Sequence, residues 1–176
     1  MTGNLVRADM DPHETSELDG DLARVTTVAE LADVVRTRAR SWAAADGATF
    51  VVRDGERCFY VDEDSIAPLW KGQRFPISSC ISGWAMEHGE VVVVPDINVD
   101  ERIPTEAYRP TFVRSLVMVP VGTPRPMAAI GASWARHHSA TAAEQHRLGV
   151  LAGRAAATLE RIGLASAPWA PSFSDR

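Results

Sequence analysis

Residues 75–121 restrict the possible folds more than any other part of the chain. Their pattern predicts a short helix over residues 79–89, an apolar strand over 91–94, an irregular loop over 95–110 and a second apolar strand over 115–121. Irregular loops longer than about a dozen residues are uncommon inside a compact domain, and they are more often functional than not. The loop is therefore the first place to expect a binding site.

This segment also carries a family resemblance. Four pieces of it, in this order and spacing, resemble the signature of GAF domains such as those of bacterial sensor histidine kinases: residues 82–85 (Ser-Gly-Trp-Ala), 95–97 (Pro-Asp-Ile), 102–104 (Arg-Ile-Pro) and 114–121 (Arg-Ser-Leu-Val-Met-Val-Pro-Val). The similarity extends from about Val25 to Leu164, which is most of the chain. It implies an antiparallel sheet with a small-molecule pocket between the sheet and the loop.

Two capping boxes frame the rest of the chain. In Thr27–Glu30 and again in Thr141–Glu144, the hydroxyl and the carboxylate can each satisfy a free backbone N–H of a first helical turn. Apolar residues at helical spacing follow both boxes. We expect a first long helix that ends at Gly47 and a second that runs to about Gly163.

The middle of the chain supplies the strands. Asp54-Gly55 suits the tight turn of a hairpin, which predicts strands over residues 48–53 and 56–62. Residues 64–74 are expected to form a loop with one helical turn, and residues 127–136 a further strand. The predicted fold is α+β, with a central antiparallel sheet of five to six strands. The N- and C-terminal helices cover one face, and the short helix and long loop cover the other, as in GAF and PAS domains.

We expect a single domain over residues 22–164. Residues 1–21 are acidic with little apolar periodicity, so they are predicted to be a flexible arm. Residues 165–176 contain two prolines and are predicted to be a flexible tail.

Composition excludes several classes of protein. The net charge of −5 and the pI near 5.5 argue against a nucleic-acid binder, which needs a basic face. No apolar run approaches the length of about 18 residues typical of a membrane span, and no signal peptide is visible at the N-terminus. We therefore expect a cytoplasmic protein without membrane contact.

A pocket between the sheet and the loop is the main site prediction, because a loop packs less completely than a helix. Alternatively, the same apolar side chains simply close the core. The candidate wall is aromatic and aliphatic, and the candidate anchors are polar: Trp70, Phe75, Ile77, Trp84, Ile97, Tyr108 and Phe112, with Ser78, Asp96, Arg114 and Ser115. Asp96 and Arg114 could orient a ligand, although capping of backbone groups or mutual pairing is the commoner role for such residues.

The sequence gives no sign of catalysis. Some small GAF proteins reduce free methionine sulfoxide with cysteines around the loop and the short helix, but the resemblance places Ser82 where their catalytic cysteine stands, and the loop has no cysteine. The two cysteines, Cys58 and Cys80, fit buried inert thiols, while the place of Cys80 near a helix N-terminus leaves redox sensitivity open. We expect no enzyme, with a free methionine sulfoxide reductase as the disfavoured alternative.

The known GAF cofactors also match poorly. A bilin attaches through a cysteine followed by histidine, and neither cysteine here has that neighbour. The residues of cyclic-nucleotide-binding GAF domains are incomplete, because Asp96 stands where those domains have phenylalanine. Haem needs an axial ligand, and His137-His138, at a predicted strand end, is expected to face solvent. We expect neither bilin, haem nor a metal.

Two functions from different classes remain open. One is a sensor, acting as a stand-alone regulatory domain that binds a small molecule and signals through a separate protein such as a histidine kinase of a two-component system. The other is a ligand-free interaction module that forms a homodimer, the commonest symmetric assembly. The residues predicted for the dimer interface are the apolar stripes of the two long helices: Val28, Val35, Trp42, Leu148, Leu151, Ala155, Leu159 and Ile162.

Overall fold

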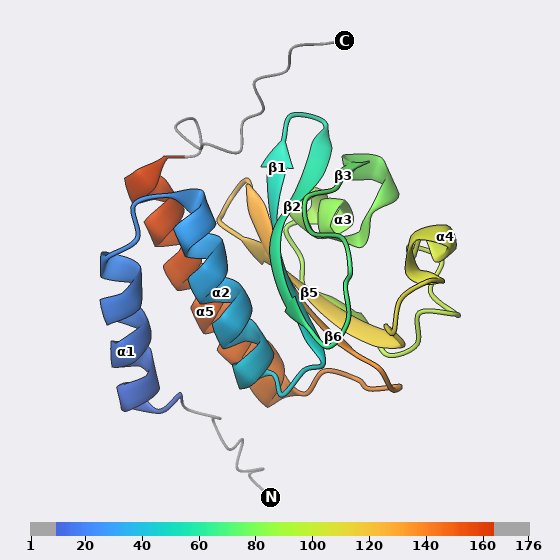
Figure 1. Cartoon of the computed structure of the whole chain (residues 1–176), viewed down its shortest axis with the longest axis horizontal. Helices are drawn as coiled ribbons and strands as arrows, with labels where there is room; N and C mark the ends of the chain where they lie inside the picture. The colour runs from blue at the N-terminus through green and yellow to red at the C-terminus, as the bar shows by residue number, and fades with distance from the viewer. Residues whose placement is uncertain (1–9, 164–176) are drawn as a thin grey trace, which may run out of the picture.

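The structure, a computed structural model, describes residues 10–163. Its centre is one antiparallel sheet of six strands in the order β3–β2–β1–β6–β5–β4 (Figure 1). The strands are β1 (Gly47–Asp54), β2 (Arg57–Ser65), β3 (Arg74–Pro76), β4 (Val92–Val94), β5 (Ser115–Val121) and β6 (Ala128–Trp134). The predicted α+β architecture is confirmed.

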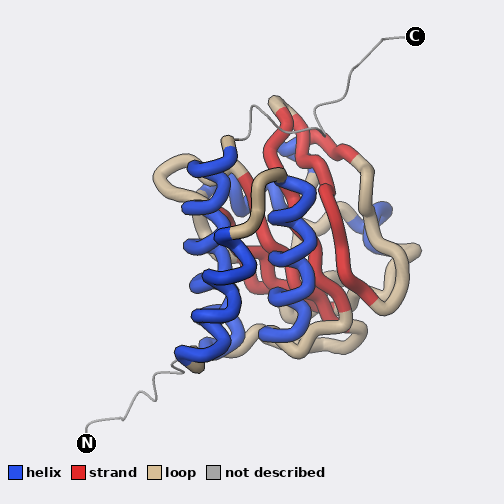
Figure 2. Tube along the Cα trace, turned by 60° about the vertical axis from the view of Figure 1, so that its left-hand side comes forward, coloured by secondary structure: helices blue, strands red, loops and turns tan. Residues whose placement is uncertain are grey.

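Two long helices cover one face of the sheet, which we call the helix face. They are α2 (Val28–Trp42) and α5 (Ala142–Ile162), and α1 (Pro12–Ala23) packs against both of them (Figures 1 and 2). The opposite face, the loop face, is covered by α3 (Ile81–His88), the 3₁₀ turn η1 (Ile77–Ser79) and the long loop with its single helical turn α4 (Thr105–Tyr108). None of the helices between residues 10 and 163 is long and apolar enough to cross a bilayer.

Both capping boxes form as predicted. The hydroxyl of Thr27 accepts a hydrogen bond from the backbone N–H of Glu30 at 3.2 Å, and that of Thr141 accepts one from Glu144 at 3.1 Å. The prediction that Gly47 ends the first helix is wrong, because α2 ends at Trp42 and Gly47 begins β1. A Cβ at position 47 would lie 2.9 Å from the ring of Phe112, so this glycine admits the long loop close to the sheet.

The arm predicted over residues 1–21 is wrong for residues 12–21, which belong to α1. Asp11 accepts a hydrogen bond from the backbone of His13, and Pro12 occupies the first turn, where its missing N–H costs nothing. Leu18 and Leu22, one helical turn apart, are both buried in the core of the helix face. Residues 1–9 and the predicted tail over residues 165–176 lie outside the described residues.

Two details of the loop face also differ from the prediction. Residues 64–74 contain no helical turn, because β2 continues to Ser65 and the remainder forms turns that lead into β3. Residues 105–108, expected to be irregular, form α4. Gly89 ends α3 in the left-handed conformation, with φ of 64°, as is usual for a helix C-terminus.

Candidate functional site

The predicted pocket residues do gather on the loop face, but most of them fill it. Trp70, Ile77, Ile97 and Tyr108 are buried in one cluster, and the rings of Phe75, Trp84 and Phe112 pack against its edge. This outcome corresponds to the alternative in which the apolar side chains close the core.

Aromatic rings hold the loop onto this cluster. The ring of Trp70 lies edge-on to Tyr108, with centroids 4.7 Å apart, and edge-on to Tyr60 at 5.5 Å. The indole N–H of Trp70 also donates a hydrogen bond to the backbone carbonyl of Ala107 at 3.2 Å. Tyr60, which the sequence analysis did not single out, is thus central to the loop face; its place in a predicted strand gave no sign of this.

A small cavity of about 130 Å³ remains beneath the loop. Ile97, Tyr108 and Arg114 line it as predicted, together with four residues that the sequence analysis missed: Asn98, Ile103, Thr105 and Arg109. It is smaller than the roughly 300–1,000 Å³ of pockets for drug-sized ligands. Only a small molecule fits without movement of the loop.

Two guanidinium groups lie at this cavity. Arg109 pairs with Glu106 across 3.1 Å at an exposed site. The side chain of Arg114 makes no hydrogen bond or ion pair within residues 10–163, while its backbone ties Ile97 and Trp134 together. The planar fork of arginine matches carboxylate and phosphate groups, so the cavity suits an anion.

The polar anchors predicted beside Arg114 have other roles. Asp96 accepts a hydrogen bond from the backbone of Asn98 at 2.9 Å and lies 3.6 Å from His137, so it caps the loop and does not pair with Arg114. Ser115 is buried and donates a hydrogen bond to the carbonyl of Arg136 at 2.6 Å. Ser78 is exposed in η1 and lines neither described cavity.

Trp84 belongs to the surface of α3. Its ring stacks on His88 at 3.9 Å, and the guanidinium of Arg102 lies 4.9 Å from its centroid. Two hydrogen bonds from Arg102 to Asp100 hold that cation in place and lower the pKa of the Asp100 carboxyl. The prediction of Trp84 as a pocket wall is therefore wrong.

The two cysteines, 22 residues apart in sequence, meet in the same buried cluster, where their sulfur atoms are 2.8 Å apart. Ser82 donates a hydrogen bond to the sulfur of Cys80 at 3.4 Å and shares one with the hydroxyl of Tyr60 at 3.2 Å. The Cys58 thiol, then Ser82 and the Gly83 backbone, lower the pKa of Cys80 to about 7 against the opposing effect of burial. The hydrogen bond with the Cys80 sulfur, and then burial, raise the pKa of the Cys58 thiol.

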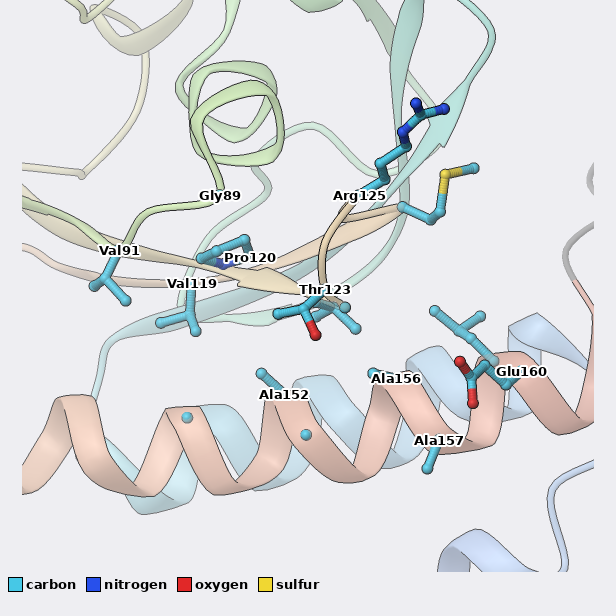
Figure 3. Close-up of a pocket in the computed structure, with 16 residues that line it drawn as sticks. Gly89, Val91, Val119, Pro120, Thr123, Arg125, Ala152, Ala156, Ala157 and Glu160 are labelled. Atoms are coloured by element: carbon cyan, nitrogen blue, oxygen red, sulfur yellow. The ribbon is translucent and has the colours of Figure 1, made fainter.

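A larger groove, of about 670 Å³, opens on the helix face beside α5 (Figure 3). Small residues of α5 form one side, and β5 with the turn that follows it forms the other: Gly149, Ala152, Gly153, Ala156 and Ala157 face Val119, Val121, Thr123 and Arg125. This groove was not among the sites predicted from the sequence. The signal for it was the glycine and alanine stripe of α5, which repeats at spacings of three and four residues.

The prediction of a dimer interface is wrong, because the residues named for it do not lie on the surface of the protein. Seven of its residues are buried within the chain, and Ile162 packs against the same core: Val28, Val35, Trp42, Leu148, Leu151, Ala155 and Leu159. They cover the sheet because an isolated apolar stripe must be buried, and the sheet lies directly beneath both helices. Any contact with a second copy would use other residues.

The family model for the GAF domain matches residues 25–160. The chain belongs to the GAF family. No curated protein matches the sequence. Among residues 10–163 of this GAF domain, no group of three or more histidine, cysteine or acidic side chains is placed to hold a metal ion.

Solved structures with the same fold come from proteins of different function. The chain is similar to a free methionine-R-sulfoxide reductase from Neisseria meningitidis in complex with its substrate, at 20% identity and a TM-score of 0.71, over 84% of this chain and 87% of that one. It is also similar to the GAF domain of an Acinetobacter phosphoenolpyruvate-protein phosphotransferase (12% identity, TM-score 0.72, 86% and 96% covered). A third is the GAF-B domain of DevS from Mycobacterium smegmatis, at 17% identity and a TM-score of 0.62, over 76% of this chain and 93% of that one. At these identities the likeness shows the fold alone.

Proposed function

We propose that this GAF domain is a cytoplasmic sensory and regulatory module, in which a small anionic molecule binds the cavity beneath the long loop. The side chain of Arg114 is the observation that supports this most directly. It lies at the cavity with no partner of its own within residues 10–163, whereas Arg102 and Arg109 of the long loop are each paired with a carboxylate. An anion in the cavity would supply the missing charge-assisted hydrogen bonds.

A change at the cavity would reach the protein surface through the long loop that covers it. It is held to the sheet by Tyr108 on Trp70 and by the hydrogen bond from Trp70 to Ala107. A ligand that binds one arrangement of the loop better than another would shift the population toward it. The partner that receives the signal would be a signalling protein, of which a histidine kinase of a two-component system is one class.

A thermal-shift screen of small carboxylates and phosphates tests the proposal, because a ligand that binds only the native state raises the melting temperature. We expect at least one anion to raise it, and Arg114→Ala to abolish the rise. Arg125→Ala, which removes an exposed arginine at the opposite groove, is the matched control and should keep the rise. A screen without any shift, or a shift that Arg114→Ala preserves, would count against the anion site.

A ligand-free interaction module is the second candidate, and the groove beside α5 is the observation that favours it. The groove is lined mainly by apolar atoms of small residues, and an added Cβ at Gly149 or Gly153 would meet nothing within 4 Å. A second copy of the chain would cover this surface in a homodimer. Light scattering coupled to gel filtration would show a dimer that Gly153→Arg converts to a monomer; a monomer at all concentrations would remove this candidate.

We further propose that the chain is not a methionine sulfoxide reductase, despite the shared fold. Ser82 occupies the position that the family resemblance assigns to the catalytic cysteine, and residues 95–110 contain no cysteine. An assay with free methionine-R-sulfoxide should show no turnover. Turnover that is lost when Cys58 and Cys80 are both replaced by serine would contradict this proposal.

A further inference from the structure

We propose that Cys58 and Cys80 form a redox-active dithiol, which a hydroperoxide oxidises to a disulfide between β2 and the start of α3. The two sulfur atoms lie 2.8 Å apart in the core of the loop face, away from the arginines at the small cavity. Because a disulfide bond is about 2.05 Å long, the two sulfurs need to approach by less than about 1 Å to bond.

The surroundings give the two thiols different roles. Cys80 stands at the N-cap of α3 and is 7% exposed, whereas Cys58 is fully buried behind it. A peroxide that arrives from solvent therefore meets Cys80 first. Cys58 is placed to attack Cys80 from the interior in the second step.

The hydrogen bonds favour Cys80 as the nucleophile. Cys58, Ser82 and the Gly83 backbone N–H stabilise the Cys80 thiolate, which holds its pKa near neutrality, at about 7. The hydrogen bond between the two sulfurs, together with burial, raises the pKa of Cys58. Cys58 therefore retains its proton while Cys80 is ionised. Thiolates, and not thiols, attack peroxides.

The reaction balances with a hydroperoxide as the only oxidant. The Cys80 thiolate attacks the terminal oxygen of the hydroperoxide, so that a sulfur–oxygen bond forms and the oxygen–oxygen bond breaks. The leaving alkoxide takes the proton of Cys58 and becomes an alcohol. With hydrogen peroxide, the leaving group is hydroxide and the product is water. The Cys58 thiolate then attacks the sulfenic sulfur of Cys80. The disulfide forms and hydroxide leaves, taking a proton from solvent, so the two sulfurs lose two electrons and the peroxide gains them.

The oxidised state would alter the loop face. Ser82 bridges Cys80 and Tyr60, and the ring of Tyr60 contacts Trp70, which holds the loop through Ala107. A disulfide removes the thiolate that accepts the Ser82 hydrogen bond. The redox state of the pair is thereby connected to the loop over the cavity through four contacts: Cys80–Ser82, Ser82–Tyr60, Tyr60–Trp70 and Trp70–Ala107.

The first test uses the full chain, reduced and folded, treated with hydrogen peroxide and then denatured and alkylated. We expect a mass loss of two hydrogen atoms, no alkylation, and a cross-linked peptide that joins Cys58 to Cys80; a reductant such as dithiothreitol should restore both thiols. Two alkylated thiols after treatment, or oxygen added to either cysteine without the cross-link, would overturn the proposal. So would a cross-link that forms only after unfolding.

Single variants separate the two roles. In Cys58→Ser the sulfenic acid of Cys80 should persist and react with dimedone, whereas in Cys80→Ser the remaining thiol should stay reduced at the same peroxide concentration. Equal oxidation of the two variants would refute the assignment. Circular dichroism confirms that both variants are folded before the comparison.

Ser82→Ala, with Ser79→Ala as the matched control, tests the hydrogen bond to Cys80. Ser79, the residue that precedes Cys80, is exposed, and within residues 10–163 it makes no hydrogen bond to either sulfur. We expect Ser82→Ala to slow oxidation by up to about tenfold below neutral pH and to move the midpoint of the pH–rate profile upward, because each unit of pKa changes the thiolate fraction by that factor. Identical profiles for the two variants would show that Ser82 does not position or activate the thiol.

Discussion

The helix face and the loop face of the sheet are covered by different kinds of structure, and they differ in chemistry. The core of the helix face consists mostly of aliphatic side chains from α2, α5 and the strands beneath them. The core of the loop face contains both cysteines and two tyrosines. The buried groups with shifted pKa values, namely Cys58, Tyr60, Cys80 and Tyr108, all lie there.

The two faces differ because the segments that cover them form their backbone hydrogen bonds in different ways. A long helix pairs its own N–H and C=O groups and presents a continuous apolar stripe to the sheet. A short helix and a loop leave more backbone groups to be paired by side chains, as Trp70 does with the carbonyl of Ala107 and Asp96 with the N–H of Asn98. Thiol and phenol groups therefore enter the core on the loop face, whereas the described core of the helix face contains neither cysteine nor tyrosine.

The largest effect on stability should come from a glycine on the loop face, which we compare with one on the helix face. In α3, a Cβ at Gly83 would overlap the backbone carbonyl of Ile77, which cannot move aside as a flexible side chain does. We expect Gly83→Ala to lower the free energy of unfolding by more than about 4 kcal/mol, or to prevent folding.

The matched variant on the helix face should have the opposite sign. Gly149 of α5 has open space around it, so Gly149→Ala should raise the free energy of unfolding by about 0.5–1 kcal/mol, since alanine favours a helix. Urea denaturation followed by circular dichroism measures both. Equal effects of the two substitutions would contradict the difference in packing between α3 and α5.

Truncation of an aliphatic side chain on each face comes next in size. Leu151 is a fully buried residue of α5, and Leu151→Ala should lower the free energy of unfolding by about 4 kcal/mol through lost burial and an unfilled cavity. Ile103 lines the existing cavity beneath the irregular loop, so Ile103→Ala should lower the free energy of unfolding by only about 2 kcal/mol, because a loop relaxes around a truncated side chain more readily than a helix layer does. Similar losses in urea denaturation would mean that the loop face is packed as rigidly as the helix face.

The ion pair between β2 and α2 should make the helix face sensitive to acid. Burial raises the pKa of Asp62, but hydrogen bonds from Lys71, the Glu63 backbone and Arg36 outweigh it and hold the pKa below its usual value. A carboxyl whose pKa is lowered in the folded state stabilises above the unfolded pKa, and that stability is lost as the pH falls through the folded pKa.

We therefore expect Asp62 to contribute about 1 kcal/mol at neutral pH, which disappears below about pH 4. Asp62→Asn should reduce the change in the free energy of unfolding over that pH range. Asp33→Asn, which removes a more exposed partner of the same arginine, is the control and should leave the slope nearly unchanged. Parallel profiles for the wild type and Asp62→Asn, measured by urea denaturation from pH 7 to pH 2, would rule out this contribution.

The smallest expected effect on stability is that of Arg114→Ala on the loop face. The side chain is exposed and makes no hydrogen bond or ion pair within the described part of the chain, so its loss should change the free energy of unfolding by less than about 0.5 kcal/mol. Arg36→Ala is the matched comparison on the helix face; it should cost more, because it breaks bonds to Asp33 and Asp62. A large loss in Arg114→Ala would show that this arginine has a structural role and weaken the proposal that it awaits a ligand.

The sequence predicted the elements whose causes are close together in the chain. Both capping boxes act over three residues, and the stripes of α2 and α5 repeat within two turns. The hairpin turns at Gly55 and Glu56, one residue beyond the predicted Asp54-Gly55, because Asp54 still pairs with Arg57 in the sheet. The prediction failed for α1 because the acidic composition of residues 1–21 outweighed the signal of two leucines, Leu18 and Leu22, which are the buried residues of this helix. It also failed at Gly47, where the position of Phe112, far along the chain, explains the glycine.

Which side chains meet was decided only in three dimensions. The sequence by itself determined that an irregular segment would cover one face of an antiparallel sheet, since the strands and the long helices account for the other. It did not determine that Tyr60, Trp70 and Tyr108 would fill that face, that Arg114 would be left beside a small cavity, or that Cys58 and Cys80 would touch. Local structure follows from neighbours a few residues apart, whereas these contacts arise between segments that only the folded sheet brings together.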